Sequence, residues 1–257
     1  MTFFDAVILG ILQGLTEFLP VSSSGHLVLA QALLGVNDFG VSFEVIVHLG
    51  TVLSVFVYFR STILRLIESL FRPAMVEERK LIIFLIIGTV PAGVIGVLFE
   101  NFFEQTFSEP LLTSFFLLVT GAILVVSRFF KNGIKPVGAG SSLIMGFGQA
   151  MAIFPGISRS GSTIVAGMIA GVEPAKAAEF SFLLVIPAIL GATVLKIKNL
   201  AQLDAAMAGH YVVGAACAFV TGLIAVYAVL AVIRRGRFEY FGYYCFAAGL
   251  FGLYLFW

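Results

Sequence analysis

Two short polar segments carry the side chains best suited to chemistry. Gln13 and Glu17 are four positions apart, so on a helix they share one face. A carboxylate and an amide on one face can hold a hard divalent cation, Mg²⁺ or Ca²⁺, through oxygen atoms, and such cations bridge to phosphates. His26 is the side chain of these segments that titrates near neutrality, so it is suited to moving a proton or attacking phosphorus.

Both segments also place hydroxyl groups where a helix is expected to begin. The free N–H groups and the dipole of a helix start attract anions. The guanidinium of Arg159 beside clustered hydroxyls is therefore suited to holding phosphate oxygens. Each hydroxyl alone is more simply explained as a helix cap, but the combination favours a phosphate site. The hydroxyl residues are Ser22, Ser23, Ser24, Ser158, Ser160, Ser162 and Thr163.

A second pair of ionisable residues lies further along the chain. Glu44 and His48 are four apart in an apolar segment, and we expect them to support the site, with Glu44 as a partner for Arg159 or His26. A buried structural pair is an equally weighted alternative. Glu17 could likewise pair structurally with Arg159. The sequence has no Walker-type lysine motif, which disfavours nucleotide hydrolysis.

The elements that position these residues are expected to lie in a membrane. The chain has 257 residues, of which 60% are hydrophobic and only 11% charged, with a net charge of +1 and a mean hydropathy of +1.08. Soluble domains carry about 25% charged residues, so a water-soluble globule is excluded. Nucleic-acid binding is also excluded, because it requires a basic excess. We expect one membrane domain over residues 1–257.

Hydropathy predicts an all-α integral membrane protein with six transmembrane helices. A helix that crosses the bilayer needs about 20 mostly apolar residues, whereas shorter apolar runs are typical of re-entrant segments. The six long stretches are residues 41–59, 81–99, 111–130, 176–197, 211–233 and 239–257. The short stretches form two re-entrant helix pairs, residues 3–19 with 24–35 and 142–154 with 161–171.

The two re-entrant pairs resemble each other. Each pair and the three spans after it form one repeat, residues 1–135 and residues 136–257. Three spans are an odd number, so we expect an inverted-topology repeat whose broken helices meet near the midplane and form the site. Chance similarity of two Gly/Ser-rich stretches is the alternative. Without a gap, the matches are Gly10/Gly146, Gln13/Gln149, Phe18/Phe154, Ser22/Ser158, Ser24/Ser160 and Gly25/Gly161.

Basic residues predict the orientation, because cytoplasmic loops carry an excess of Lys and Arg. The segment that holds Glu100, Glu104 and Glu109 is assigned to the outer side, where Lys196 and Lys198 are exceptions. The basic residues assigned to the cytoplasmic side are Arg60, Arg65, Arg72, Arg79, Lys80, Arg128, Lys131, Lys135, Arg234, Arg235 and Arg237.

Two motifs resemble those of the bacterial undecaprenyl-diphosphate phosphatases, also called the bacitracin-resistance proteins. The first is Gln-Gly-Leu-Thr-Glu at residues 13–17 with Pro-Val-Ser-Ser-Ser-Gly-His at residues 20–26. The second is Pro-Gly-Ile-Ser-Arg-Ser-Gly-Ser-Thr at residues 155–163. Both motifs are long and correctly ordered, and the resemblance covers essentially the whole chain.

The resemblance implies an enzyme of the bacterial cytoplasmic membrane. It would hydrolyse undecaprenyl diphosphate to undecaprenyl phosphate and inorganic phosphate, with a divalent cation and a site that opens toward the outer side. The product is the lipid carrier for peptidoglycan and other envelope polymers, and its formation limits the target of bacitracin. The oligomeric state stays open, a homodimer included.

Carried over position by position, the resemblance implies roles for individual residues. It makes Glu17, Ser23, His26 and Arg159 catalytic and places the metal on Glu17 and Gln13. Because Gln13 is an amide, a mechanism that needs two carboxylates there is doubtful. The attacking group stays open between Ser23, His26 and water. A polyprenyl-phosphate transporter that uses the same anion site is the alternative function. The implied substrate-binding residues are Gln13, Ser22, Ser24, Ser158, Ser160 and Thr163.

Overall fold

The computed structural model describes residues 1–34, 41–99, 102–103, 109–197 and 207–257. Within these ranges the chain is helical and contains no strand, apart from one isolated β-bridge between Lys135 and Val172. The predicted all-α class is thus confirmed. Three of the charged residues used for orientation lie outside the described residues: Glu100, Glu104 and Lys198.

Four of the described helices are long and apolar enough to cross a membrane. The other two predicted spans are also helices, α3 (Val41–Tyr58) and α13 (Tyr240–Phe256). However, α13 has only 17 residues, and α3 is followed by α4 (Arg60–Phe71) at an angle of 82°. The chain is therefore a multi-pass membrane protein, and the count of six spans stays a prediction. The four long helices are α5 (Val76–Leu98), α7 (Pro110–Val126) with η1 (Ser127–Phe130), α10 (Pro174–Leu195) and α12 (Ala208–Arg234).

The two predicted broken pairs are pairs of short helices. Their helices begin earlier than predicted where a cap sets the start. Helix α8 begins after Gly138, whose N–H donates to the Ser141 hydroxyl at 2.8 Å. Ser158 caps α9, so Arg159 is the first residue of that helix. The four short helices are α1 (Phe3–Phe18), α2 (Ser23–Leu34), α8 (Ala139–Met151) and α9 (Arg159–Ile169).

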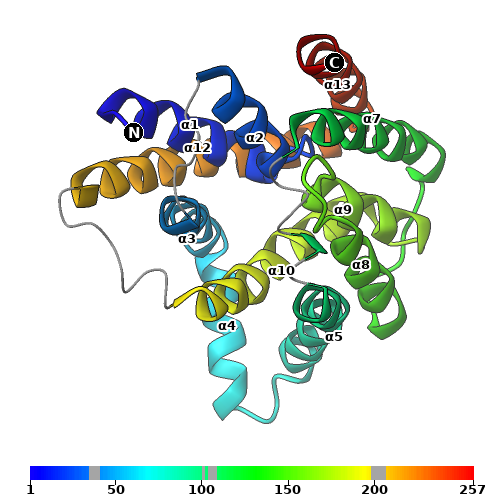
Figure 1. The fold of residues 1–257 in the computed structure, drawn as a ribbon. Helices are drawn as coiled ribbons and strands as arrows, with labels where there is room; N and C mark the ends of the chain where they lie inside the picture. Colours follow the sequence, from blue (N-terminus) through cyan, green and yellow to red (C-terminus); the bar gives the residue numbers. More distant parts are fainter. Residues whose placement is uncertain (35–40, 100–101, 104–108, 198–206) are drawn as a thin grey trace.

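Small residues bring the short helices into close contact with long ones. Helix α1 runs along α12, and α8 runs along α5 (Figure 1). A Cβ atom on Gly146 would lie only 2.6 Å from the carbonyl oxygen of Gly88, so the contact of α8 with α5 requires glycine. Its predicted equivalent, Gly10, lies against Gly214 in α12. Such contacts between small residues are typical of helices packed in membranes. The inverted repeat itself stays a prediction.

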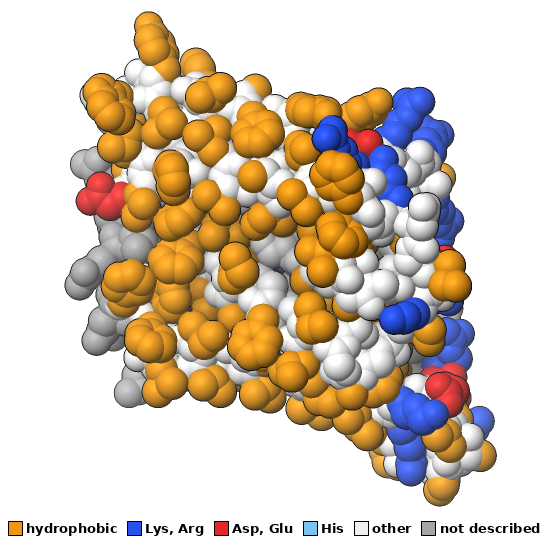
Figure 2. All heavy atoms as spheres, turned by 90° about the vertical axis from the view of Figure 1, so that its right-hand side faces the viewer, with side chains coloured by type: hydrophobic (Ala, Val, Ile, Leu, Met, Phe, Trp, Pro, Cys, Tyr) orange, Lys and Arg blue, Asp and Glu red, His pale blue; other side chains and the backbone are white. Residues whose placement is uncertain are grey.

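The surface separates into an apolar region and a basic end. Figure 2 shows hydrophobic side chains over most of one face and Lys and Arg side chains gathered at one end of the molecule. Large apolar side chains such as Ile86, Phe115 and Leu250 are more than half exposed, as expected where lipid is the solvent. At the basic end, Lys131 donates to the carbonyl of Gly236 and to Glu239, each at 2.7 Å.

Candidate active site

The two breaks between the short helices contact each other inside the protein. The Ser22 hydroxyl lies 3.4 Å from the carbonyl oxygen of Ile157, to which it donates. In the opposite direction, the Ser160 hydroxyl donates to the carbonyl of Leu19 at 3.3 Å. Because each break braces the other, the first residues of α2 and α9 are held in the same region.

The backbone of both breaks has an unusual conformation. Ser22 has a φ of 71° and Gly156 a φ of 96°, both in the left-handed region. That region is uncommon for residues other than glycine, and such strain is often kept at functional sites. A Cβ atom on Gly25 would lie 2.9 Å from the Cα atom of Gly156, so the breaks can meet this closely only with glycine at position 25.

The centre of the site is the carboxylate of Glu17, which is 7% exposed. Its Oε1 atom lies 2.5 Å from Nη2 of Arg159. Its Oε2 atom accepts from the Ser23 hydroxyl at 2.6 Å and from Nε2 of Gln13 at 3.0 Å. Nε2 of His48 is 3.7 Å from the same oxygen. We call these five residues the Glu17 cluster; they come from α1, α2, α3 and α9.

The pairing with Arg159 explains how a charge is accommodated at this depth. A buried carboxylate is stable only when it is paired and hydrogen-bonded, and Glu17 is both. Arg159 is also anchored to α10, because its Nη1 donates to the carbonyl of Ser181 at 3.4 Å. A guanidinium has five N–H groups, so Arg159 keeps donors for an anion.

His26 lies next to this cluster in sequence, but its ring bonds to other groups. Its Nδ1 atom is 2.8 Å from the carbonyl oxygen of Ser22. Its Nε2 atom is 2.8 Å from the hydroxyl of Tyr244 in α13. Arg159 pairs with Glu17, and both ring nitrogens of His26 are bonded to Ser22 and Tyr244. The expected pairing of Glu44 with Arg159 or His26 stays a prediction. His48, by contrast, belongs to the cluster.

Of the hydroxyls expected to hold phosphate, that of Ser162 is buried without a partner among the described residues, and the others make hydrogen bonds within the protein. Ser22 accepts from the N–H of Gly25 at 3.2 Å, and Ser158 accepts from the N–H of Gly161 at 3.1 Å. Both serines therefore cap their helices, which is the role predicted from the sequence for each hydroxyl taken alone. The Oγ atoms of Ser22 and Ser24 and those of Ser158 and Ser160 are each 3.3 Å apart. The role of these hydroxyls toward a substrate stays a prediction.

Comparisons with known proteins identify the family. The sequence model described as "Bacitracin resistance protein BacA" matches residues 6–251. The chain belongs to the BacA family. It is similar to a protein of Salinibacter ruber that is named undecaprenyl-diphosphatase, with 42% identity over 99% of this chain and 100% of the relative. A protein of Syntrophotalea carbinolica with the same name is 44% identical over 97% of each chain. One of Methanobrevibacter smithii, also so named, is 40% identical over 97% of this chain and 96% of the relative.

In this BacA-family chain, Glu17 and Gln13 are the residues of the cluster that carry side-chain oxygens of the kind a divalent cation binds. No group of three or more His, Cys, Asp and Glu side chains that could hold a metal occurs among the described residues. Oε1 of Gln13, however, is a buried acceptor without a hydrogen-bond partner in the described part of the chain. Carboxylate and amide oxygens are ligand types that Mg²⁺ accepts, and this ion is commonly held by one or two carboxylates together with substrate phosphates.

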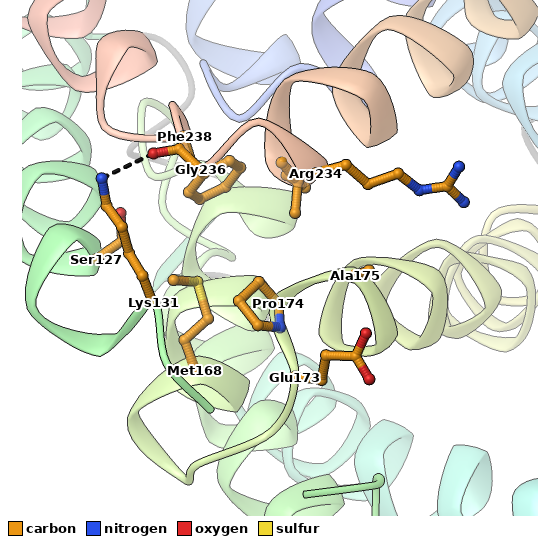
Figure 3. Close-up of a pocket in the computed structure, with 10 residues that line it drawn as sticks. Ser127, Lys131, Met168, Glu173, Pro174, Ala175, Arg234, Gly236 and Phe238 are labelled. Carbon is orange, nitrogen blue, oxygen red and sulfur yellow. Dashed lines mark hydrogen bonds between the residues drawn. The ribbon is translucent and has the colours of Figure 1, made fainter. Parts of the chain in front are cut away.

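Two hollows in the surface of this BacA-family chain lie away from the Glu17 cluster. One is a cavity of about 300 Å³ at the basic end, and none of the residues that line it belongs to the cluster. Figure 3 shows Lys131 reaching toward Gly236 on one side of this cavity, while the side chains of Arg234 and Glu173 extend on the other. The second hollow, of about 330 Å³, lies beside Phe59 and Phe180 and likewise has no lining residue from the cluster.

Three residues that support this BacA-family site could not be identified from the sequence. The backbone carbonyl of Ser181 accepts from Arg159, and the hydroxyl of Ser181 contacts the hydroxyl of Thr163. The Thr120 hydroxyl accepts from the N–H of Ser158 at 3.0 Å. Tyr244 contacts His26. Ser181 and Thr120 are small polar residues within apolar helices, a weak signal that many packing residues share.

Proposed function

We propose that this BacA-family chain is an undecaprenyl-diphosphatase. It hydrolyses undecaprenyl diphosphate to undecaprenyl phosphate and inorganic phosphate, which recycles a lipid carrier for cell-wall synthesis and confers bacitracin resistance. The names of the relatives support this function. The structural observation that carries it is the contact of one buried carboxylate, Glu17, with both Ser23 and Arg159. Ser23 as a nucleophile, Glu17 as a proton acceptor and the guanidinium of Arg159 as an anion-binding group are then within reach of one phosphate.

Arg159 and the helix starts bind the diphosphate. The first N–H groups of a helix have no partner within it, and α2 and α9 both begin in this region. Phosphoryl transfer depends mainly on positioning and on stabilising charge. Arg159 has N–H groups left for the phosphate oxygens beside its bond to Oε1 of Glu17, while Oε2 of Glu17 accepts from Ser23 and is placed to take its proton.

Among the three possible nucleophiles, the hydrogen bond from Ser23 to Glu17 favours Ser23. In this scheme the Ser23 oxygen forms a bond to the terminal phosphorus, its proton passes to Glu17, and the bond to the leaving undecaprenyl phosphate breaks. Water then attacks the phosphoserine, which releases inorganic phosphate and restores the Ser23 hydroxyl. His26 is one turn further along α2, where it can relay protons during the second step.

Glu17 and Gln13 would hold a divalent cation, Mg²⁺ or Ca²⁺, next to the substrate. When bound, the cation offsets the negative charge of the phosphates. The carboxylate of Glu17 and the unpaired Oε1 atom of Gln13 are the oxygens that this chain provides for it.

We place the protein in the bacterial cytoplasmic membrane as a multi-pass protein whose site opens toward the outer side. The clustering of Lys and Arg at one end of the molecule supports the assignment of that end to the cytoplasmic side (Figure 2). The opening toward the outer side rests on the resemblance of the motifs. A homodimer is compatible with this placement.

The deciding experiment measures phosphate release from undecaprenyl diphosphate by the detergent-purified protein, with and without a chelator. The folded variant Glu17→Gln is the control, and it should release no phosphate above background. Release by the wild type alone supports the hydrolase. A transporter needs two compartments and breaks no covalent bond, so a well-folded wild type that releases no phosphate with lipid and cation supplied would overturn the proposal.

A further inference from the structure

Tyr244 in α13 bonds to the one imidazole nitrogen of His26 that the backbone leaves unoccupied. Nδ1 of His26 is 2.8 Å from the carbonyl oxygen of Ser22. A carbonyl oxygen can only accept, so Nδ1 carries the hydrogen. In the neutral ring Nε2 is then an acceptor, and the Tyr244 hydroxyl at 2.8 Å is its donor. We propose that Tyr244 is a positioning residue that holds the Nε2 lone pair of His26 in place for proton transfer.

The orientation of the two rings agrees with this role. The rings of His26 and Tyr244 are nearly parallel, with an angle of 8° between their planes and 5.6 Å between their centres. The ring of His26 is thus held at both nitrogens and lies nearly parallel to the ring of Tyr244. The carbonyl of Ser22 sets the tautomer, and the hydroxyl of Tyr244 adds a second point that fixes the angle of the ring.

Helix α13 is itself anchored beside the first break. Cys245, which follows Tyr244, is fully buried, and its Sγ atom is 3.8 Å from the carbonyl oxygen of Pro20. Further along α13, a Cβ atom on Gly249 would lie 2.8 Å from the carbonyl oxygen of Ser114 in α7. These contacts fix the backbone of α13 beside the break, so the Cα atom of Tyr244 cannot move away without movement of the helix.

The side chain of Tyr244 also stands at the edge of the protein. It is 49% exposed, so one side of its ring faces the lipid while its hydroxyl reaches His26. A lipid diphosphate that enters between the helices from the membrane would pass such a residue. This role rests on the proposed phosphatase function, because it concerns the proton transfer of that reaction.

The first measurement does not depend on turnover. The chain has only three histidines, so ¹⁵N-labelled imidazoles can be assigned with His26→Gln as the reference. In Tyr244→Phe, the Nε2 resonance of His26 should move toward the chemical shift of an imidazole nitrogen that accepts no hydrogen bond. The resonance of the protonated Nδ1 should stay unchanged. Tyr243→Phe, which removes a neighbouring exposed hydroxyl, should change neither resonance.

The second measurement is phosphate release from undecaprenyl diphosphate. Tyr244→Phe should lower kcat about threefold to tenfold with little change in KM, the range expected for one lost neutral hydrogen bond. Tyr243→Phe should keep the wild-type values. An unchanged Nε2 resonance in Tyr244→Phe overturns the proposal, and so does a wild-type kcat in that variant. A wild type without phosphatase activity whose Nε2 resonance still depends on Tyr244 would refute the proposed function and leave the contact intact.

Discussion

Ser23 and Arg159 hold the same carboxylate from two different helices. Ser23 is the first residue of α2 and Arg159 the first residue of α9, and the sequence match of the two breaks makes them equivalent positions. Ser23 contacts Oε2 of Glu17 at 2.6 Å and Arg159 contacts Oε1 at 2.5 Å. Two equivalent helix starts thus converge on one acid, whose own equivalent is the apolar Ile153. The reactive groups are asymmetric although the breaks are similar.

The pair of Glu17 and Arg159 should couple strongly in stability. Glu17→Gln or Arg159→Met alone leaves a buried charge without its partner, which costs about 3–5 kcal/mol of unfolding free energy. The double variant removes both charges, so it should be less destabilised than the sum of the single variants. Denaturant unfolding in detergent micelles gives the three values for a double-mutant cycle.

An exposed ion pair provides the control for this double-mutant cycle. Lys80 and Glu77 are 2.8 Å apart but exposed, so Glu77→Gln should change stability by less than about 1 kcal/mol. Additive effects of Glu17→Gln and Arg159→Met would contradict the pairing seen in the structure.

Ser23 and Ser24 should differ sharply in activity. Ser23→Ala removes the hydroxyl on Glu17 and should lower kcat at least about 10²-fold, the loss found for single catalytic donors. Ser24→Ala should lower it far less, because the hydroxyl bond recorded for Ser24 is the 3.3 Å contact with Ser22. Phosphate release measures both, and circular dichroism checks the fold. Equal losses in the two variants would exclude Ser23 as the nucleophile.

The sequence was sufficient to select residues that the structure brings together in the candidate site, because polar residues are conspicuous in a chain this apolar. Gln13, Glu17, Ser23, His48 and Arg159 were all candidates, and the structure brings them together. The helices were predictable for a related reason, since the length of an apolar run sets what it can form in a membrane.

What the sequence could not give is the set of contacts between distant segments. Tyr244 is 218 positions from His26, and nothing in α13 distinguishes it from the neighbouring tyrosines. The left-handed backbone of Ser22 was equally hidden, because serine rarely adopts it and the equivalent Ser158 does not. These features depend on how the helices pack, which local pattern does not determine.

Gln13 should set the cation dependence of the enzyme. If its Oε1 atom helps to hold the cation, Gln13→Leu should raise the Mg²⁺ or Ca²⁺ concentration needed for half-maximal phosphate release. Chelation should abolish activity in the wild type, and added cation should restore it. The equivalent Gln149 provides the control: both of its amide atoms are buried without a partner among the described residues, so Gln149→Leu should leave the cation dependence unchanged. Equal cation requirements in Gln13→Leu and the wild type would remove Gln13 from the metal site.

At the basic end, the contact between Lys131 and Glu239 should make stability depend on pH. Burial alone would raise the pKa of Glu239, but the hydrogen bond from Lys131 and the nearby positive charges outweigh it and hold that pKa below its ordinary value of 4.5. A carboxyl with a lowered pKa in the folded state stabilises it above the ordinary pKa, and this contribution is lost as the pH falls through the folded value. Glu239→Gln should therefore lower Tm at about pH 7, and its difference from the wild type should shrink as the pH falls below 4.5. Thermal unfolding of both proteins across this range measures the effect, and a difference that stays constant with pH would show that the contact contributes through packing instead of charge.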